Sequence, residues 1–170
     1  MKRVFVIIDC SGSIVSDGWE MVGTINEITQ DLVREVSPHA SDIRVICYSQ
    51  NVKVHWERKS GKLLTDLNET SFEGPSNLGK AYAFIKKQID AEKINCKDCV
   101  FVLISDGEAT DNYRKQLDIL DPDHTAQRVA ISIGSSHNAT DKHVLSSDCA
   151  FNRGYVDKDY FIDKVKDLAD

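Results

Sequence analysis

Residues 3–13 read Arg3-Val4-Phe5-Val6-Ile7-Ile8-Asp9-Cys10-Ser11-Gly12-Ser13, an apolar run followed by a polar loop. The β-branched and aromatic run at 3–8 predicts a strand buried on both faces. The Asp9 carboxylate and the Ser11 and Ser13 hydroxyls follow at alternate positions where this strand ends. In open α/β sheets, ligands bind beyond the carboxyl ends of the strands. Because no histidine or other base lies nearby in the sequence, these oxygens indicate a hard-cation site rather than a nucleophile.

The Asp9-x-Ser11-x-Ser13 pattern resembles the first segment of the metal-ion-dependent adhesion site of von Willebrand factor A domains. Such domains complete the site with a hydroxyl in a loop before a helix and with an aspartate after a central strand. Here the segment Glu73–Gly79 precedes a helical pattern and carries Ser76 where the family usually has threonine. The second segment of the resemblance is therefore present, with a serine oxygen in place of the threonine oxygen.

The third segment follows the run Cys99–Ile104, which predicts a central strand and leads into Ser105-Asp106-Gly107. The order and spacing of all three segments agree with the family, and the resemblance covers essentially the whole chain. It therefore implies a single domain over residues 1–170. The compact loops and the stretch from Ser105 to Asp111 are most similar to stand-alone bacterial members, such as the tellurium-resistance-associated group.

The resemblance also implies a metal and a way of binding. The hydroxyls of Ser11, Ser13 and Ser76 would be direct ligands of Mg²⁺ or Mn²⁺, which favour hard oxygens. Asp9 and Asp106 would hold the ion directly or through water. Neutral hydroxyl ligands leave the charge of the cation largely uncompensated, so an open position would accept a glutamate or aspartate from a protein partner. In the alternative reading, these residues only terminate strands, form turns and cap helices.

Four further residues lie on loops expected at the rim of the same site, where they would contact a partner. They are Trp19, Glu73, Glu108 and Thr110. The alternative for each of them is an ordinary solvated loop residue.

Hydrophobic periodicity and turn residues predict alternating strands and helices. The predicted strands are 3–8, 43–48, 52–56, 99–104, 129–133 and 151–156. Two predicted helices cover 113–120 and 140–146. The other three run from a cap at Asp17 to Val36, from a cap at Asn77 to Ile89, and from a cap at Asp157 to Leu168. This alternation predicts a mostly parallel sheet with helices on both faces. The family resemblance implies a Rossmann-like, doubly wound, six-stranded sheet of order 3-2-1-4-5-6, with the third strand antiparallel.

Composition restricts the class of partner and the compartment. The chain has 170 residues with a net charge of −6, which disfavours non-specific binding to nucleic acid. No apolar stretch approaches the roughly 20 residues that span a bilayer, and the N-terminal apolar run is too short for a signal peptide. Five cysteines, an odd number, favour a reducing compartment. These features predict a cytoplasmic protein without a membrane or nucleic-acid partner.

The Cys96-Lys97-Asp98-Cys99 segment is a single CxxC motif before a strand. It is compatible with a redox pair or with half of a zinc site, but no second half is apparent in the sequence. The third reading is a pair of loop thiols without a further role.

Three functions compete. A non-enzymatic, divalent-metal-dependent binding module, with an adaptor or scaffold role in a bacterial stress or tellurium-resistance type of system, accounts for all three segments. A metal-dependent phosphoester hydrolase would need an activated water with a nearby base or second metal, and only Asp9 and Asp106 converge. A nucleotide-binding Rossmann protein would carry G-x-G-x-x-G after the first strand, which residues 9–13 lack. A metal-independent interaction surface on the same fold is the remaining alternative.

Overall fold

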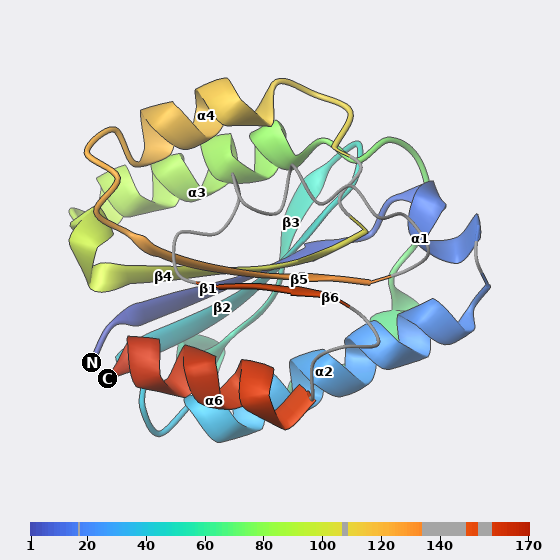
Figure 1. Ribbon diagram of the computed structural model, residues 1–170, viewed down its shortest axis with the longest axis horizontal. Helices are drawn as coiled ribbons and strands as arrows, with labels where there is room; N and C mark the ends of the chain where they lie inside the picture. The colour runs from blue at the N-terminus through green and yellow to red at the C-terminus, as the bar shows by residue number, and fades with distance from the viewer. Residues whose placement is uncertain (17, 107–108, 134–148, 153–157) are drawn as a thin grey trace.

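The structure is a computed structural model that describes residues 1–16, 18–106, 109–133, 149–152 and 158–170, with only the backbone described at 69 and 149–152. Within these residues a six-stranded sheet has the order β3-β2-β1-β4-β5-β6 (Figure 1). Its strands are β1 (Arg3–Asp9), β2 (Asp42–Tyr48), β3 (Val52–Glu57), β4 (Cys99–Ser105), β5 (Gln127–Ser132) and β6 (Cys149–Asn152). Only the β2–β3 pair is antiparallel among the paired strands. The predicted fold class, strand order and antiparallel third strand are confirmed.

Helices cover both faces of the sheet (Figure 1). They are α1 (Gly12–Ser16), α2 (Glu20–Val36), α3 (Leu78–Glu92), α4 (Tyr113–Leu120) and α6 (Lys158–Ala169), with short 3-10 turns η1 (Arg58–Ser60), η2 (Leu67–Glu69) and η3 (Cys96–Asp98). Helices α3 and α4 lie on one face, and α2 and α6 lie on the other. The chain ends lie together, since the Met1 ammonium donates to the Asp170 carbonyl at 2.8 Å.

The start of α2 and the presence of α1 differ from the prediction. The N-cap position of α2 is Trp19, which forms no side-chain cap, rather than Asp17. The five-residue helix α1 was not predicted, because one turn is too short to show a helical period. The predicted helix at 140–146 and residues 153–156 of the last predicted strand lie outside the described residues.

The core follows from the alternation of side chains along a strand buried on both faces. On β1, Val4, Val6 and Ile8 are buried in a cluster with α2 and α6. Phe5 and Ile7 are buried in a second cluster with α3 and α4, and the Phe5 ring lies 5.8 Å from that of Phe101. Both faces of β1 are therefore buried. Packing on both sides holds this strand in place and with it Asp9 at its carboxyl end.

A buried arginine joins the C-terminal end of α3 to the sheet. Arg44 of β2 donates hydrogen bonds to Glu92 and, at 3.0 Å, to the Gln88 side-chain oxygen. Arg3 of β1 donates to the same Glu92 carboxylate. Burial alone raises the pKa of Glu92, but the hydrogen bonds from Arg44 and Arg3 outweigh it and lower the pKa to about 2.

Acid is expected to remove the stability that Glu92 contributes. Because its pKa is below the ordinary 4.5, the contribution is complete above about pH 4.5 and is lost as the pH falls toward about 2. The Glu92 side chain is 32% exposed, so solvent screening leaves roughly 1 kcal/mol. Urea unfolding between pH 7 and pH 3 should give wild type a higher free energy of unfolding than Glu92→Gln at neutral pH. The difference between the two proteins should shrink as the pH falls. A difference that stays constant over this range would contradict the assignment.

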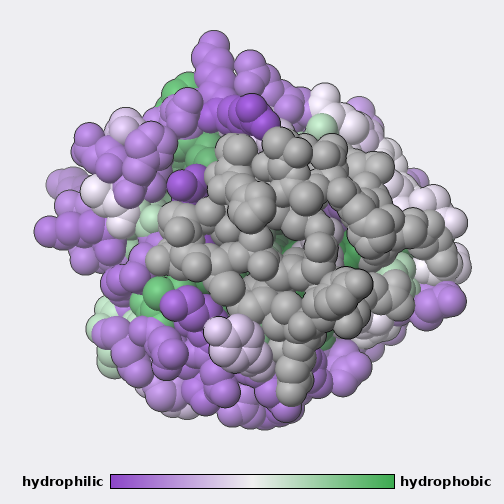
Figure 2. Space-filling view, in the orientation of Figure 1, coloured by the Kyte–Doolittle hydropathy of each residue, from purple (hydrophilic) through white to green (hydrophobic). Residues whose placement is uncertain are grey.

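Outside the grey atoms, the face seen in Figure 2 is mostly hydrophilic, with small hydrophobic patches. Among the residues that the structure describes, no helix combines the length and hydrophobicity needed to cross a bilayer.

Candidate functional site

The site lies where β1 and β4 end at the same edge of the sheet. These strands are parallel neighbours, with Ile8 paired to Ile104. Asp9 is the last residue of β1, and Ser105 is the last residue of β4. The parallel register therefore brings the first and third sequence segments together.

The Asp9 carboxylate is the centre of the described contacts. One oxygen, Oδ1, accepts a hydrogen bond from the Ser11 amide at 2.9 Å. The other, Oδ2, accepts from the hydroxyls of Ser76 and Ser105, each at 2.8 Å. Asp9 is fully buried, and Ser11, Ser76 and Ser105 are also buried. One residue from each of the three segments thus contacts the same carboxylate.

The first loop places two hydroxyls side by side. The Ser11 and Ser13 Oγ atoms lie 2.9 Å apart, where the chain enters α1. The loop is held against the second segment by two backbone hydrogen bonds, from Gly12 N to Gly74 O at 3.0 Å and from Glu73 N to Cys10 O at 3.1 Å. This pairing fixes the serines relative to the loop that carries Ser76.

The third loop is held to the second through α3. The Thr110 amide donates to the Ser76 carbonyl at 2.8 Å. The Asp111 carboxylate accepts hydrogen bonds from the Gly79 amide at 2.9 Å and the Lys80 amide at 3.2 Å, in the first turn of α3. The predicted cap, Asn77, occupies the N-cap position but forms no side-chain cap. Asp111 replaces it, as an anion at the positive end of the helix.

The structure brings four of the five predicted ligand residues into direct contact, namely Asp9, Ser11, Ser13 and Ser76. Asp106 is buried directly after Ser105 at the same edge. Sequence reasoning missed Ser105, although its position at the end of the central strand, beside the predicted Asp106, was an available signal.

Neutral donors surround a buried charge at Asp9. No lysine, arginine or histidine of the described residues forms an ion pair with its carboxylate. The buried Tyr48 hydroxyl is nearby, and burial together with the Asp9 charge raises the pKa of Tyr48 well above its ordinary value. The described residues contain no cluster of three or more His, Cys, Asp or Glu side chains arranged for a metal. The available donors are instead carboxylates and serine hydroxyls, which suit a hard cation.

The rim residues are only partly described. Trp19 is 64% exposed at the start of α2. Glu73 and Thr110 are exposed, and their amides bond to the site loops. Glu108 lies outside the described residues. Contact of these side chains with a partner stays a prediction.

The CxxC segment lies at η3 and the start of β4, away from the site edge. Burial raises the pKa of Cys96 to about 11 and that of Cys99 to about 12. Both are free thiols. Protonated thiols are poor nucleophiles, so the reading without a redox role is favoured.

The sequence profile of the family described as von Willebrand factor type A domain matches residues 4–168. The chain belongs to this family. Von Willebrand factor A domains generally mediate metal-dependent protein interactions and adhesion. No sequence among the curated proteins matches the chain.

Solved structures with the same fold come from distant sources. They include proximal thread matrix protein 1 from the mussel byssus, with a TM-score of 0.75 and 19% identity over 99% of this chain and 48% of that one. The ArnB paralog VWA2 from Sulfolobus acidocaldarius has a TM-score of 0.69 and 20% identity over 99% and 45%. The manganese-loaded TRAP protein of Plasmodium vivax has a TM-score of 0.70 and 14% identity over 99% and 73%. This von Willebrand factor A domain spans about half the length of the first two.

Proposed function

We propose that this chain is a non-enzymatic protein-binding domain that captures an acidic side chain of its partner through a divalent cation. The observation that carries the proposal is the fully buried Asp9 carboxylate, which has neutral donors from all three segments and no ion pair with a described side chain. A buried carboxylate without a counter-charge is costly, and a cation beside it would offset that cost.

The residues present fit Mg²⁺ or Mn²⁺. The hydroxyls of Ser11, Ser13 and Ser76 would ligate the ion, with Asp9 and Asp106 acting directly or through water. When bound, the cation supplies a hard electrophilic position for a carboxylate oxygen of the partner. The chain contributes preorganisation, because hydrogen bonds fix Asp9 and hold the Ser11 and Ser13 hydroxyls 2.9 Å apart. The manganese-loaded TRAP structure, which has the same fold, supports the choice of metal.

The partner we propose is a protein that presents an exposed aspartate or glutamate. The exposed Trp19 would supply an apolar contact beside the metal, because interfaces are enriched in tryptophan. An adaptor or scaffold role in a bacterial stress or tellurium-resistance type of system, in the cytoplasm, completes the proposal. A reducing compartment fits the thiols of Cys10, Cys47, Cys96 and Cys99, which are free in the part of the chain that the structure describes.

Retention of the partner is expected to depend on metal and on Asp106. Immobilised wild-type domain, incubated with an extract of its source cells in Mg²⁺, should retain a partner. EDTA should lower the retained amount at least tenfold, because removing the cation removes most of the charge attraction. Asp106→Ala should show the same loss in Mg²⁺. The matched control is Asp118→Ala, which removes an exposed carboxylate on α4. Equal retention with EDTA, or by Asp106→Ala, would refute the mechanism.

A further inference from the structure

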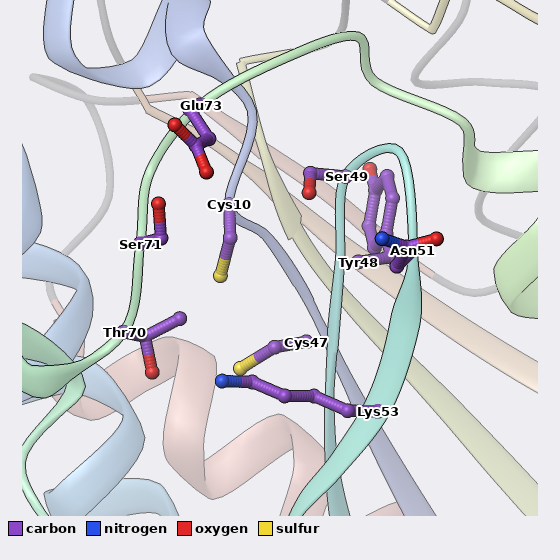
Figure 3. A pocket seen from close by; sticks show the side chains of 9 residues that line it. All are labelled: Cys10, Cys47, Tyr48, Ser49, Asn51, Lys53, Thr70, Ser71 and Glu73. Carbon is purple, nitrogen blue, oxygen red and sulfur yellow. The ribbon is translucent and has the colours of Figure 1, made fainter.

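A cavity lies beside the first loop and is lined by Cys10. It has a volume of about 210 Å³ and is enclosed by the end of β1, the β2–β3 hairpin and the segment 70–73 (Figure 3). The side chains of Cys10, Cys47 and Lys53 line it together with hydroxyl, amide and carboxylate groups. The metal proposal above uses none of these three side chains.

The fold brings the two thiols together. Cys10 directly follows β1, Cys47 lies in the adjacent β2, and the Cys10 amide donates to the Tyr48 carbonyl at 2.8 Å. Both side chains lie on the sheet face covered by α2 and α6. Both side chains line the cavity, and the sulfur of Cys10 points toward Cys47 (Figure 3). Each residue is 2% exposed, and each is a free cysteine.

The cavity is also lined by a cation, Lys53. The Lys53 ammonium points toward the thiols (Figure 3). The contact with Cys47 and burial raise the pKa of Cys10 well above its ordinary value, and the charge of Lys53 offsets part of this rise. It forms no hydrogen bond or ion pair with any described residue. A positive charge at this place offsets negative charge on nearby sulfur atoms.

We propose that Cys10 and Cys47 form a two-thiolate binding site for a soft, monovalent cation of the cuprous class. Thiolates select soft cations, and no histidine lines the cavity to complete a four-coordinate zinc site. On binding, each thiol releases its proton to solvent and forms one S–Cu bond, without oxidation or reduction. Two thiolates and one Cu⁺ carry a net charge of about −1, which Lys53 neutralises.

This site differs in chemistry from the oxygen site at Asp9. Serine hydroxyls and carboxylates suit hard divalent ions, and paired thiolates suit soft ones. Copper binding can therefore be measured in magnesium-free buffer, and its outcome is independent of the proposed partner-binding function.

The test is an anaerobic titration of the reduced wild-type domain with Cu⁺ against the chelator bicinchoninate. We expect one Cu⁺ per chain and, by X-ray absorption, two sulfur neighbours. Cys10→Ser and Cys47→Ser should each weaken binding at least tenfold, whereas Cys96→Ser, which alters a thiol bonded to the Leu120 carbonyl, should not. Lys53→Met should weaken binding about fivefold. The proposal would be overturned if bicinchoninate kept all the Cu⁺ in the presence of the wild-type domain. It would also be overturned if Cys47→Ser bound Cu⁺ with unchanged affinity.

A second probe keeps the test decisive if a serine variant fails to fold. Phenylarsine oxide reacts with two adjacent thiols, forming two As–S bonds while its oxygen leaves as water with both thiol protons. Wild-type domain should take up one arsenical, mapped to Cys10 and Cys47 by mass spectrometry. Modification confined to Cys96 and Cys99, or no modification, would show that the pair cannot bind one soft atom.

Discussion

Replacement of Asp9 by asparagine is expected to abolish the response of the domain to Mg²⁺ and Mn²⁺ while leaving the metal-free fold intact. Asparagine keeps the size of the side chain and one acceptor oxygen, so it can still accept from either Ser76 and Ser105 or the Ser11 amide. It lacks the negative charge that would attract the cation. The metal affinity should therefore fall at least a hundredfold, equivalent to about 2.7 kcal/mol or more.

Calorimetry and unfolding measure the two parts of this prediction separately. Wild type should bind one divalent ion, and a hundredfold excess over its dissociation constant should raise the free energy of unfolding by about 2.7 kcal/mol. Asp9→Asn should show neither effect, yet unfold cooperatively without metal. The matched control, Asp118→Asn, changes an exposed carboxylate on α4 and should behave as wild type. If Asp9→Asn bound Mg²⁺ or Mn²⁺ with wild-type affinity, Asp9 would not be part of the metal site.

The sequence was sufficient for contacts that follow from strand order. The alternation of strands and helices predicted a mostly parallel sheet, and the family resemblance implied that the strands now seen as β1 and β4 are neighbours. Parallel neighbours have their carboxyl ends at one edge of the sheet. Asp9 and Ser76 were grouped only by the family resemblance, and in the structure the Ser76 hydroxyl donates to the Asp9 carboxylate although 67 residues separate them. Their binding of a metal remains a prediction.

The contacts that sequence reasoning missed depend on side-chain direction and register. Ser105 was taken as part of a motif beside Asp106, and only the structure shows its hydroxyl on the Asp9 carboxylate. The Cys10–Cys47 pair requires knowing that both thiols face the same side of neighbouring strands. Each cysteine by itself indicated only a small buried side chain.

The capping of α3 is the clearest case of a long-range contact replacing a local one. Asn77 stands at the N-cap position and has the residue type that favours capping. Asp111 takes that role from 32 residues away along the chain, with an ionised acceptor for two amides. Rules for helix capping consider only residues next to the helix end in the sequence. They therefore cannot predict a carboxylate that is supplied by another loop.

Loss of this remote cap is expected to destabilise the domain by about 2–3 kcal/mol in Asp111→Ala. Two backbone amides of α3 lose a charged acceptor, and hydrogen bonds to charged groups are the stronger kind. The third loop also loses an attachment to the loop that carries Ser76. Urea unfolding in metal-free buffer gives the stability change, and the same variant should bind Mg²⁺ more weakly.

Glycine-to-alanine substitutions in α3 and α2 also test the contact between Asp111 and α3. They are expected to change the free energy of unfolding in opposite directions. A Cβ atom at Gly79 would lie 2.8 Å from Asp111 Oδ2, whereas a Cβ at Gly23 of α2 would meet nothing within 4 Å. Alanine is favoured over glycine inside helices by up to about 1 kcal/mol, so Gly23→Ala should stabilise the domain. Gly79→Ala should instead destabilise it by about 1–2 kcal/mol, because the added methyl displaces the carboxylate that caps the helix.

The double variant separates this explanation from ordinary crowding. Once Asp111→Ala has removed the carboxylate, the methyl of Gly79→Ala has no cap to displace and should become neutral or stabilising. The two substitutions would then be strongly non-additive, as expected for residues in direct contact. If Gly79→Ala cost the same with and without Asp111, crowding by the neighbouring helix would be the cause. The carboxylate would then have no special part in joining the second and third loops of the site.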